Sequence, residues 1–112
     1  MARPVRVTVS GGTGVSAPIP LNNMSTPFSV GVGCDISAGG SLTYTVEHTF
    51  DDVFAKTFTP AAATWFPNSG LTAQTIDKDG NYTAPITAVR LNVGVWASGS
   101  VTMTIIQAGG GV

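Results

Sequence analysis

Four side chains that can bind cations or exchange protons fall within six positions of the sequence: Glu47, His48, Asp51 and Asp52. Carboxylate oxygens are ligands of hard cations, and a carboxylate beside a histidine can act as an acid–base pair. Neighbouring residues of a strand point to opposite faces, so we expect Glu47 and His48 to face apart. The segment from Phe50 to Asp52 is typical of a strand end. We therefore favour a structural corner over a metal or catalytic site.

A second polar group, Asp77, Asp79 and Asn81, has the spacing that opens an EF-hand loop. The glutamate that closes such a loop at its twelfth position is replaced here by Ala88. Asp79 is followed by a glycine, and Asp-Gly is a signal for a tight turn, so we predict a plain turn over Asp77–Asn81. The alternative is a calcium-stabilised lectin-like domain that would use the carboxylates of Asp51, Asp52, Asp77 and Asp79.

Enzymatic motifs are absent from the sequence. His48 is the single histidine, so a serine or cysteine triad would require it, and no nucleophile elbow occurs. The run Gly11–Gly14 lacks the lysine of a phosphate-binding loop. The lone cysteine, Cys34, excludes an intrachain disulfide and lies on an apolar strand face, where a buried thiol is expected. We predict a protein that is not an enzyme and has no cofactor or bound metal.

Two long stretches of alternating apolar and polar residues must carry these side chains. In the first, Phe28–Ile36 alternates, Ala38–Gly40 offers a turn of small residues, and alternation resumes from Leu42. In the second, Val89 to Trp96 is followed by the turn Ala97–Gly99 and by a returning strand, Val101–Ile105. A period of two is typical of half-buried antiparallel strands, so we predict two β-hairpins and an all-β fold.

Shorter segments complete the predicted fold. We expect strands over Val5–Val9, Val53–Phe58 and Leu71–Ile76, one helical turn over Ala61–Phe66, and only edge strands in the proline-containing segment Thr13–Pro27. This spacing favours one antiparallel β-sandwich or jelly-roll-like domain of about seven or eight strands over residues 1–112. Residues 1–6 are predicted to be an N-terminal arm and residues 108–112 a flexible C-terminal tail.

The composition favours association with other proteins. Hydrophobic residues make up 43% of the 112 residues, which is ample for a core, whereas charged residues make up only 10%. The usual charged content of globular proteins is about 25%. Exposed apolar surface on a protein with so few charges usually marks a contact site. We therefore expect a homo-oligomer, either a dimer or a trimer, or a subunit of a larger assembly.

Charge and hydropathy argue against two classes of partner. The net charge is −1, and the few basic residues are scattered, whereas nucleic-acid binding uses clustered lysine and arginine. No segment has the length of a membrane span, and the N-terminus has no apolar run typical of a signal peptide. We expect no nucleic-acid or membrane partner, and synthesis in a cytoplasm.

Aromatic residues in or beside predicted loops are candidate contact residues. Trp65, Phe66 and Tyr82 could anchor a subunit interface, as aromatic residues often do. Alternatively, Trp65 and Tyr82, with the nearby Asn68 and Asn81, could form a sugar-binding platform. Arg90 points away from the predicted core and could pair with a carboxylate of a neighbouring subunit or be solvated.

The sequence resembles a family of small virion structural proteins of tailed bacteriophages. The resemblance is carried by Arg3–Val7, Pro27–Val32, Tyr44–Asp52, Pro85–Val93 and Val101–Gln107. It implies a non-enzymatic protein of the particle, of the capsid decoration (cement) type, located on the capsid surface and bound to the major capsid protein. A tail or head-fibre component and a receptor- or glycan-binding module are the alternatives.

A decoration protein bridges neighbouring capsomers through many weak contacts that act together. Such bridging requires exposed contact elements, and we expect them in the N-terminal arm, in the proline-rich part Ala17–Pro27 and among the loop aromatics. The arm could add a strand to a neighbour's sheet edge. The predicted partner-binding residues are Arg3, Arg6, Ile19, Leu21, Trp65, Phe66, Tyr82 and Arg90.

Overall fold

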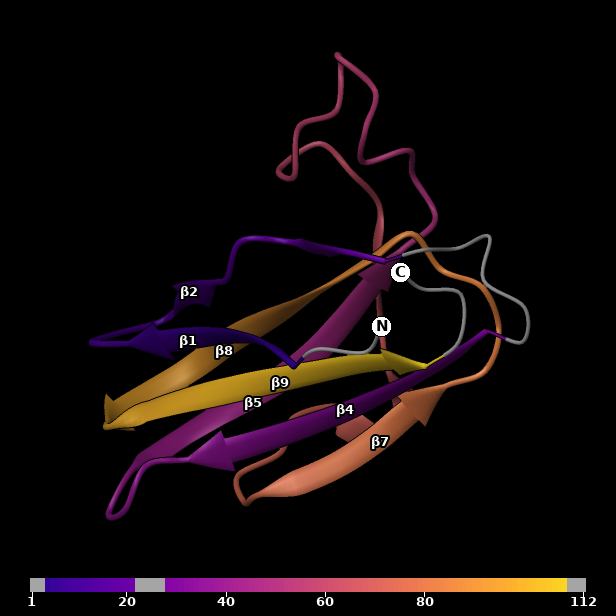
Figure 1. The fold of residues 1–112 in the computed structure, drawn as a ribbon. Coiled ribbons are helices and arrows are strands. Elements are labelled where there is room, and N and C mark those ends of the chain that lie inside the picture. The colour runs from indigo at the N-terminus through magenta and orange to yellow at the C-terminus, as the bar shows by residue number, and fades with distance from the viewer. Residues whose placement is uncertain (1–3, 22–27, 109–112) are drawn as a thin grey trace.

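Strands with alternating side chains build two antiparallel sheets in this chain (Figure 1). The computed structural model describes residues 4–21 and 28–108. Sheet A contains, in spatial order, β1 (Val5–Ser10), β9 (Ser100–Ala108), β4 (Ser29–Ile36) and β7 (Lys78–Tyr82). Sheet B contains β2 (Gly14–Val15), β8 (Ala88–Ser98), β5 (Ser41–Thr49) and β6 (Trp65–Pro67), with β3 (Ile19–Pro20) also paired to β8. The prediction of an all-β sandwich is confirmed.

The core lies between the sheets and is formed by the apolar positions of the alternating strands. In β4, Val30, Val32 and Cys34 are buried, whereas Gly31 and Asp35 are exposed. Burial raises the pKa of the Cys34 thiol to about 12, despite a hydrogen bond to Tyr44 that lowers it. The predicted burial of this cysteine is confirmed. A thiol with so high a pKa carries almost no thiolate at neutral pH, which agrees with the expected lack of reactivity.

The two alternating stretches turn where predicted, but neither forms a hairpin. β4 pairs with β7 and β9, whereas β5 pairs with β6 and β8. Likewise β8 belongs to sheet B and β9 to sheet A. Each turn therefore carries the chain from one sheet to the other. Alternation specifies which side chains face the core, but it does not specify the partner strand. A turn of small residues can connect two strands of a hairpin or carry the chain to the other sheet.

The two crossings pack against each other at one end of the sandwich, which we call the turn end (residues 37–40 and 98–100). The Ser37 amide donates to the Ser100 carbonyl oxygen at 2.9 Å, and the Ser100 amide donates to Ser37 Oγ at 3.0 Å. Gly99 has a φ of +84°, and a Cβ there would lie 2.6 Å from the Cα of Gly40. The close packing of the two crossings thus requires glycine at position 99.

A β-bulge interrupts the alternation of β8. Val93 pairs with Tyr44 and Val95 pairs with Thr43, so Gly94 is an extra residue between them. The bulge reverses the direction of the side chains that follow. Val95, predicted to continue the apolar face, is exposed, and Trp96 packs against the core instead.

The segment between β5 and β7 differs most from its prediction. Residues 53–58 form turns instead of a strand, and Trp65 and Phe66 belong to β6 instead of a helical turn. Leu71–Ile76 is not a strand: it begins at the end of the 3₁₀ helix η1 (Ser69–Leu71) and continues with a single bridge from Gln74 to Tyr44. These segments are short and weakly periodic, so contacts with the rest of the fold decide their conformation.

The predicted turn over Asp77–Asn81 is also wrong, because residues 78–82 form β7. Gly80 lies within that strand, and a Cβ at this position would come within 3.0 Å of the fully buried Leu71 side chain. The glycine of the Asp-Gly pair therefore permits a close approach of η1 to the strand instead of a tight turn.

Residues assigned to the predicted arm and to the predicted tail belong to strands. Val5 and Arg6 belong to β1 and pair with Ile105 and Thr104 of β9. Ala108, predicted to begin the flexible tail, is the last residue of β9 and pairs with Ser29. Residues 1–3, including Arg3, and residues 109–112 lie outside the described residues.

Candidate functional site

Four aromatic rings gather at the end of the sandwich opposite the turn end, and we call this region the aromatic end (His48, Phe50, Phe66 and Tyr82). The His48 ring lies 5.0 Å from the Tyr82 ring, 5.6 Å from Phe50 and 6.0 Å from Phe66, between ring centroids. The Phe50 and Phe66 rings are 5.7 Å apart. All four rings therefore form one continuous cluster.

Strand register positions this cluster. His48 continues the inward series Leu42, Tyr44 and Val46 of β5 but lies at the end of the strand, where it is only half-buried. Phe66 is the register partner of His48 across the β5–β6 pair. Tyr82 is paired with the buried Val30 and enters from the opposite sheet. The cluster thus joins the two sheets at the open end of the sandwich.

The polar centre of the cluster is a 3.0 Å hydrogen bond between His48 Nδ1 and the Tyr82 hydroxyl. Burial lowers the pKa of His48. Burial also raises the pKa of Tyr82 to about 12, although a hydrogen bond with Asn68 acts in the opposite direction. At neutral pH the pair is therefore an uncharged imidazole and an uncharged phenol. This arrangement orients the rings and stabilises the cluster without concentrating charge.

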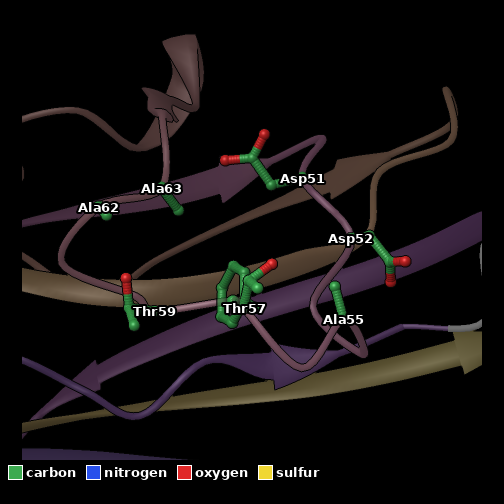
Figure 2. A pocket seen from close by; sticks show the side chains of 8 residues that line it. Asp51, Asp52, Ala55, Thr57, Thr59, Ala62 and Ala63 are labelled. Atoms are coloured by element: carbon green, nitrogen blue, oxygen red, sulfur yellow. The ribbon is translucent and has the colours of Figure 1, made fainter.

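The loop after β5, residues 50–64, projects from the aromatic end (Figure 1). Its two carboxylates hold the loop itself together: Asp51 Oδ2 accepts from the Thr64 amide at 2.9 Å, and Asp52 Oδ1 accepts from the Phe54 amide at 3.0 Å. Figure 2 shows these carboxylates pointing in different directions. Both residues line a hollow of about 240 Å³. The predicted structural corner matches these contacts.

The side chains proposed for a cation site do not converge. Glu47 lies on the outer face of sheet B, and Asp77 Oδ1 accepts from the Ile36 amide at 2.8 Å, away from the loop that carries Asp51 and Asp52. Among the described residues, no group of three or more histidine, cysteine, aspartate or glutamate side chains is placed to hold a metal ion. The described part of the chain also contains no helix long and apolar enough to cross a membrane.

Two of the predicted contact residues are occupied within the chain. Arg90 Nε donates to Glu47 Oε1 at 2.8 Å, and the Arg90 Cζ atom lies 4.2 Å from the Trp65 ring centroid. The Arg90 and Glu47 side chains are only 14% and 16% exposed. Trp65 Nε1 also donates to the Pro60 carbonyl oxygen. The charge of Arg90 is thus paired with Glu47 across neighbouring strands, and the alternative of a solvated Arg90 side chain is wrong.

The other predicted contact residues fall into two groups. Ile19, Leu21 and Tyr82 belong to the buried core, so their side chains offer little surface to a partner. Arg6 and Phe66 are exposed. The sugar platform is only partly assembled: Asn68, Asn81 and Tyr82 line a hollow of about 450 Å³ beside His48, but Trp65 is not among the residues that line it.

Sequence reasoning missed two exposed aromatic side chains of this region. Phe54 is 77% exposed and Phe50 is 59% exposed, compared with 45% for Phe66. Phe50, Phe54 and Leu21 line a hollow of about 360 Å³. Phe50 was interpreted only as part of a corner and Phe54 as part of a strand. Both residues flank Asp51-Asp52, where the alternating pattern stops. That position could have predicted that their side chains lie on an exposed loop.

Comparison with known proteins does not identify the family of this chain. No family model, curated protein or solved structure matches the chain.

Proposed function

We propose that this chain is a non-enzymatic virion structural protein of a tailed bacteriophage, of the capsid decoration type, and that it docks on the major capsid protein through its aromatic end. The sequence resemblance is one line of support. The low charged content of 10% is another, because a protein with few surface charges and exposed apolar side chains is suited to association with other proteins.

The observation that carries the proposal is the exposure of three phenylalanine side chains, Phe50, Phe54 and Phe66, at one end of a β-sandwich. Aromatic residues dominate the binding energy of protein interfaces, and they do so best when they are presented without a large loss of conformational freedom. Phe50 and Phe66 are in contact with each other and with His48, and the loop of Phe54 is held by Asp51 and Asp52.

A decoration role uses this geometry directly. Each copy would contribute a small apolar contact, and many copies on the same shell would act together to hold neighbouring capsomers. No proton transfer or bound cofactor is required for such a role.

The test is binding of the purified chain to capsids that lack it, measured as copies retained per capsid after sedimentation. Phe54→Ser should weaken binding by roughly tenfold or more, the effect of removing a hot-spot aromatic residue. Val95→Ser is the matched control, because Val95 is 62% exposed and its partner Thr43 places it near the turn end. Equal binding by both variants would contradict the proposed docking surface.

A glycan-binding module is the second candidate, and the hollow lined by Asn68, Asn81 and Tyr82 is the observation that favours it. Amide groups beside an aromatic ring can hydrogen-bond sugar hydroxyls, although Tyr82 is largely buried and Trp65 is engaged by Arg90. Binding to a glycan array that is lost in Asn81→Ala, with capsid binding absent, would favour this candidate over the decoration role.

A further inference from the structure

The two sheets present strand edges that differ greatly in how they are protected. The edges of sheet A are β1 and β7 (Figure 1). The edges of sheet B are β6 and the β2–β3 side. An exposed edge displays unpaired amides and carbonyls and can pair with another chain, so natural proteins shorten, charge, interrupt or cover their edges.

Three of the edges carry such protection. β7 contains Lys78, Asp79 and Gly80, and η1 packs against it through Leu71. β6 has three residues and ends at Pro67. β2 and β3 have two residues each, and β3 ends at Pro20. Proline removes an edge amide, and short strands offer few hydrogen bonds, so none of these edges is a good template for pairing.

The fourth edge, β1, carries only one of these devices, the single charge of Arg6. Its six residues pair with β9 in uninterrupted register, from Val5 opposite Ile105 to Ser10 opposite Ser100. Among residues 4–21 and 28–108, its backbone pairs with β9 alone. Val7 and Val9 pack against the core, and Val5 lies on the same face of the strand but is 46% exposed. Arg6, Thr8 and Ser10 face outward and are exposed. The strand has high β-propensity, a single charge and no interior proline.

We propose that β1 pairs with β1 of a second copy, antiparallel across a two-fold axis, to join two four-stranded sheets into one continuous sheet. A two-fold axis perpendicular to the sheet places valine opposite valine and outward residues opposite outward residues. Centring the axis on Val7 aligns Val5 with Val9 and Arg6 with Thr8 of the second copy. Centring it on Arg6 would oppose two like charges, which is unfavourable.

A second copy of this chain is the partner that fits this edge best, because the strand is complementary to itself. Opposed valines on one face form favourable cross-strand pairs, and the outward face opposes a cation with a neutral hydroxyl. The net charge of −1 gives two copies little mutual repulsion. An isologous dimer is also the commonest closed assembly. This inference does not depend on the capsid role, and its test contains no capsid.

Thr8→Lys should break the pairing, because in the predicted register it places a lysine opposite Arg6 at two symmetric positions. Thr102→Lys is the matched control. The hydroxyls of Thr8 and Thr102 share a 2.8 Å hydrogen bond, so both variants lose it and both add one positive charge. Only Thr8 lies on the edge strand, since Thr102 belongs to β9. The double variant Arg6→Glu/Thr8→Lys should restore pairing, because each lysine would then face a glutamate.

Sedimentation equilibrium of the full chain, with circular dichroism to verify folding, provides the test. We expect a dimer for the wild type, a dissociation constant raised roughly tenfold or more by Thr8→Lys, little change with Thr102→Lys, and recovery in the double variant. A monomeric or trimeric wild type overturns the proposal, and so does equal dimerisation of the two single variants. A double variant that stays as weak as Thr8→Lys overturns the predicted register.

Discussion

The turn end and the aromatic end close the same sandwich in opposite ways. At the turn end, small residues let two crossings approach until Gly99 and Gly40 leave no room for a Cβ. At the aromatic end, large rings remain partly in solvent, and a loop extends beyond them. Tight packing at one end serves stability, because it fixes how the sheets are joined. Incomplete burial at the other end leaves apolar surface exposed, and the proposed docking on a capsid would use that surface.

The largest expected loss of stability comes from substitution of a closely packed glycine at the turn end. Gly99→Ala combines a positive φ with a clash against the Gly40 backbone, so we expect it to lower the free energy of unfolding by about 3 kcal/mol. Gly39→Ala is the control, because Gly39 also has a positive φ but nothing lies within 4 Å of its Cβ position. It should cost about 1 kcal/mol in urea denaturation. Equal costs would show that the crossings are not tightly packed.

Tyr82→Phe tests the polar centre of the aromatic end. The substitution keeps the ring but removes the hydroxyl that bonds to His48 Nδ1, so we expect a loss of about 1 kcal/mol of unfolding free energy. In a His48→Leu background, where that partner is absent, the same change should cost less. If the cost is the same in both backgrounds, the hydrogen bond does not stabilise this end.

The pH dependence of stability gives a smaller effect at the same place. Because burial lowers the pKa of His48 in the folded state, the unfolded chain binds a proton more readily, and stability rises with pH through this range. The stability that comes from a neutral, buried His48 is fully present above the pKa of histidine in the unfolded chain, about 6.5, and is lost as the pH falls below that value. The wild type should therefore lose more stability than His48→Gln between neutral and mildly acidic pH. Parallel curves for the two proteins would contradict this assignment.

Phe54→Ser should produce the smallest change in stability. The side chain is 77% exposed on a loop, so we expect unfolding free energy to change by no more than about 0.5 kcal/mol. Together with a large loss of capsid binding, this result would separate the contact role of the aromatic end from any role in folding. A cost of several kcal/mol would mean that the loop packs in solution and does not present Phe54 to a partner.

Much of the fold follows from local pattern, because alternation specifies both strand and buried face. The strands that contain Val30, Tyr44, Leu91 and Met103 were predicted for this reason, as was the burial of Cys34. The pairing of those strands was not, since the apolar faces of β4 and β5 fit either a hairpin or two facing sheets. The bulge at Gly94 was also missed, because the residues around it still alternate in sequence.

The candidate site was predicted less completely than the fold. Phe66 and Tyr82 were identified from their proximity to loops, but Phe54 was assigned to a strand because Val53–Phe58 contains several apolar residues. Arg90 appeared available to a partner because its position faces outward, yet it pairs with Glu47 on the neighbouring strand and lies over the Trp65 ring. Such pairing depends on the register between β5 and β8, which places Glu47 opposite Arg90 and which no local pattern reveals.

Immunogold labelling of intact phage particles with an antibody against this chain tests the central proposal most directly. A decoration protein predicts gold distributed over the head, at many copies per particle. Gold confined to the tail, or particles that carry no label, would contradict the decoration role.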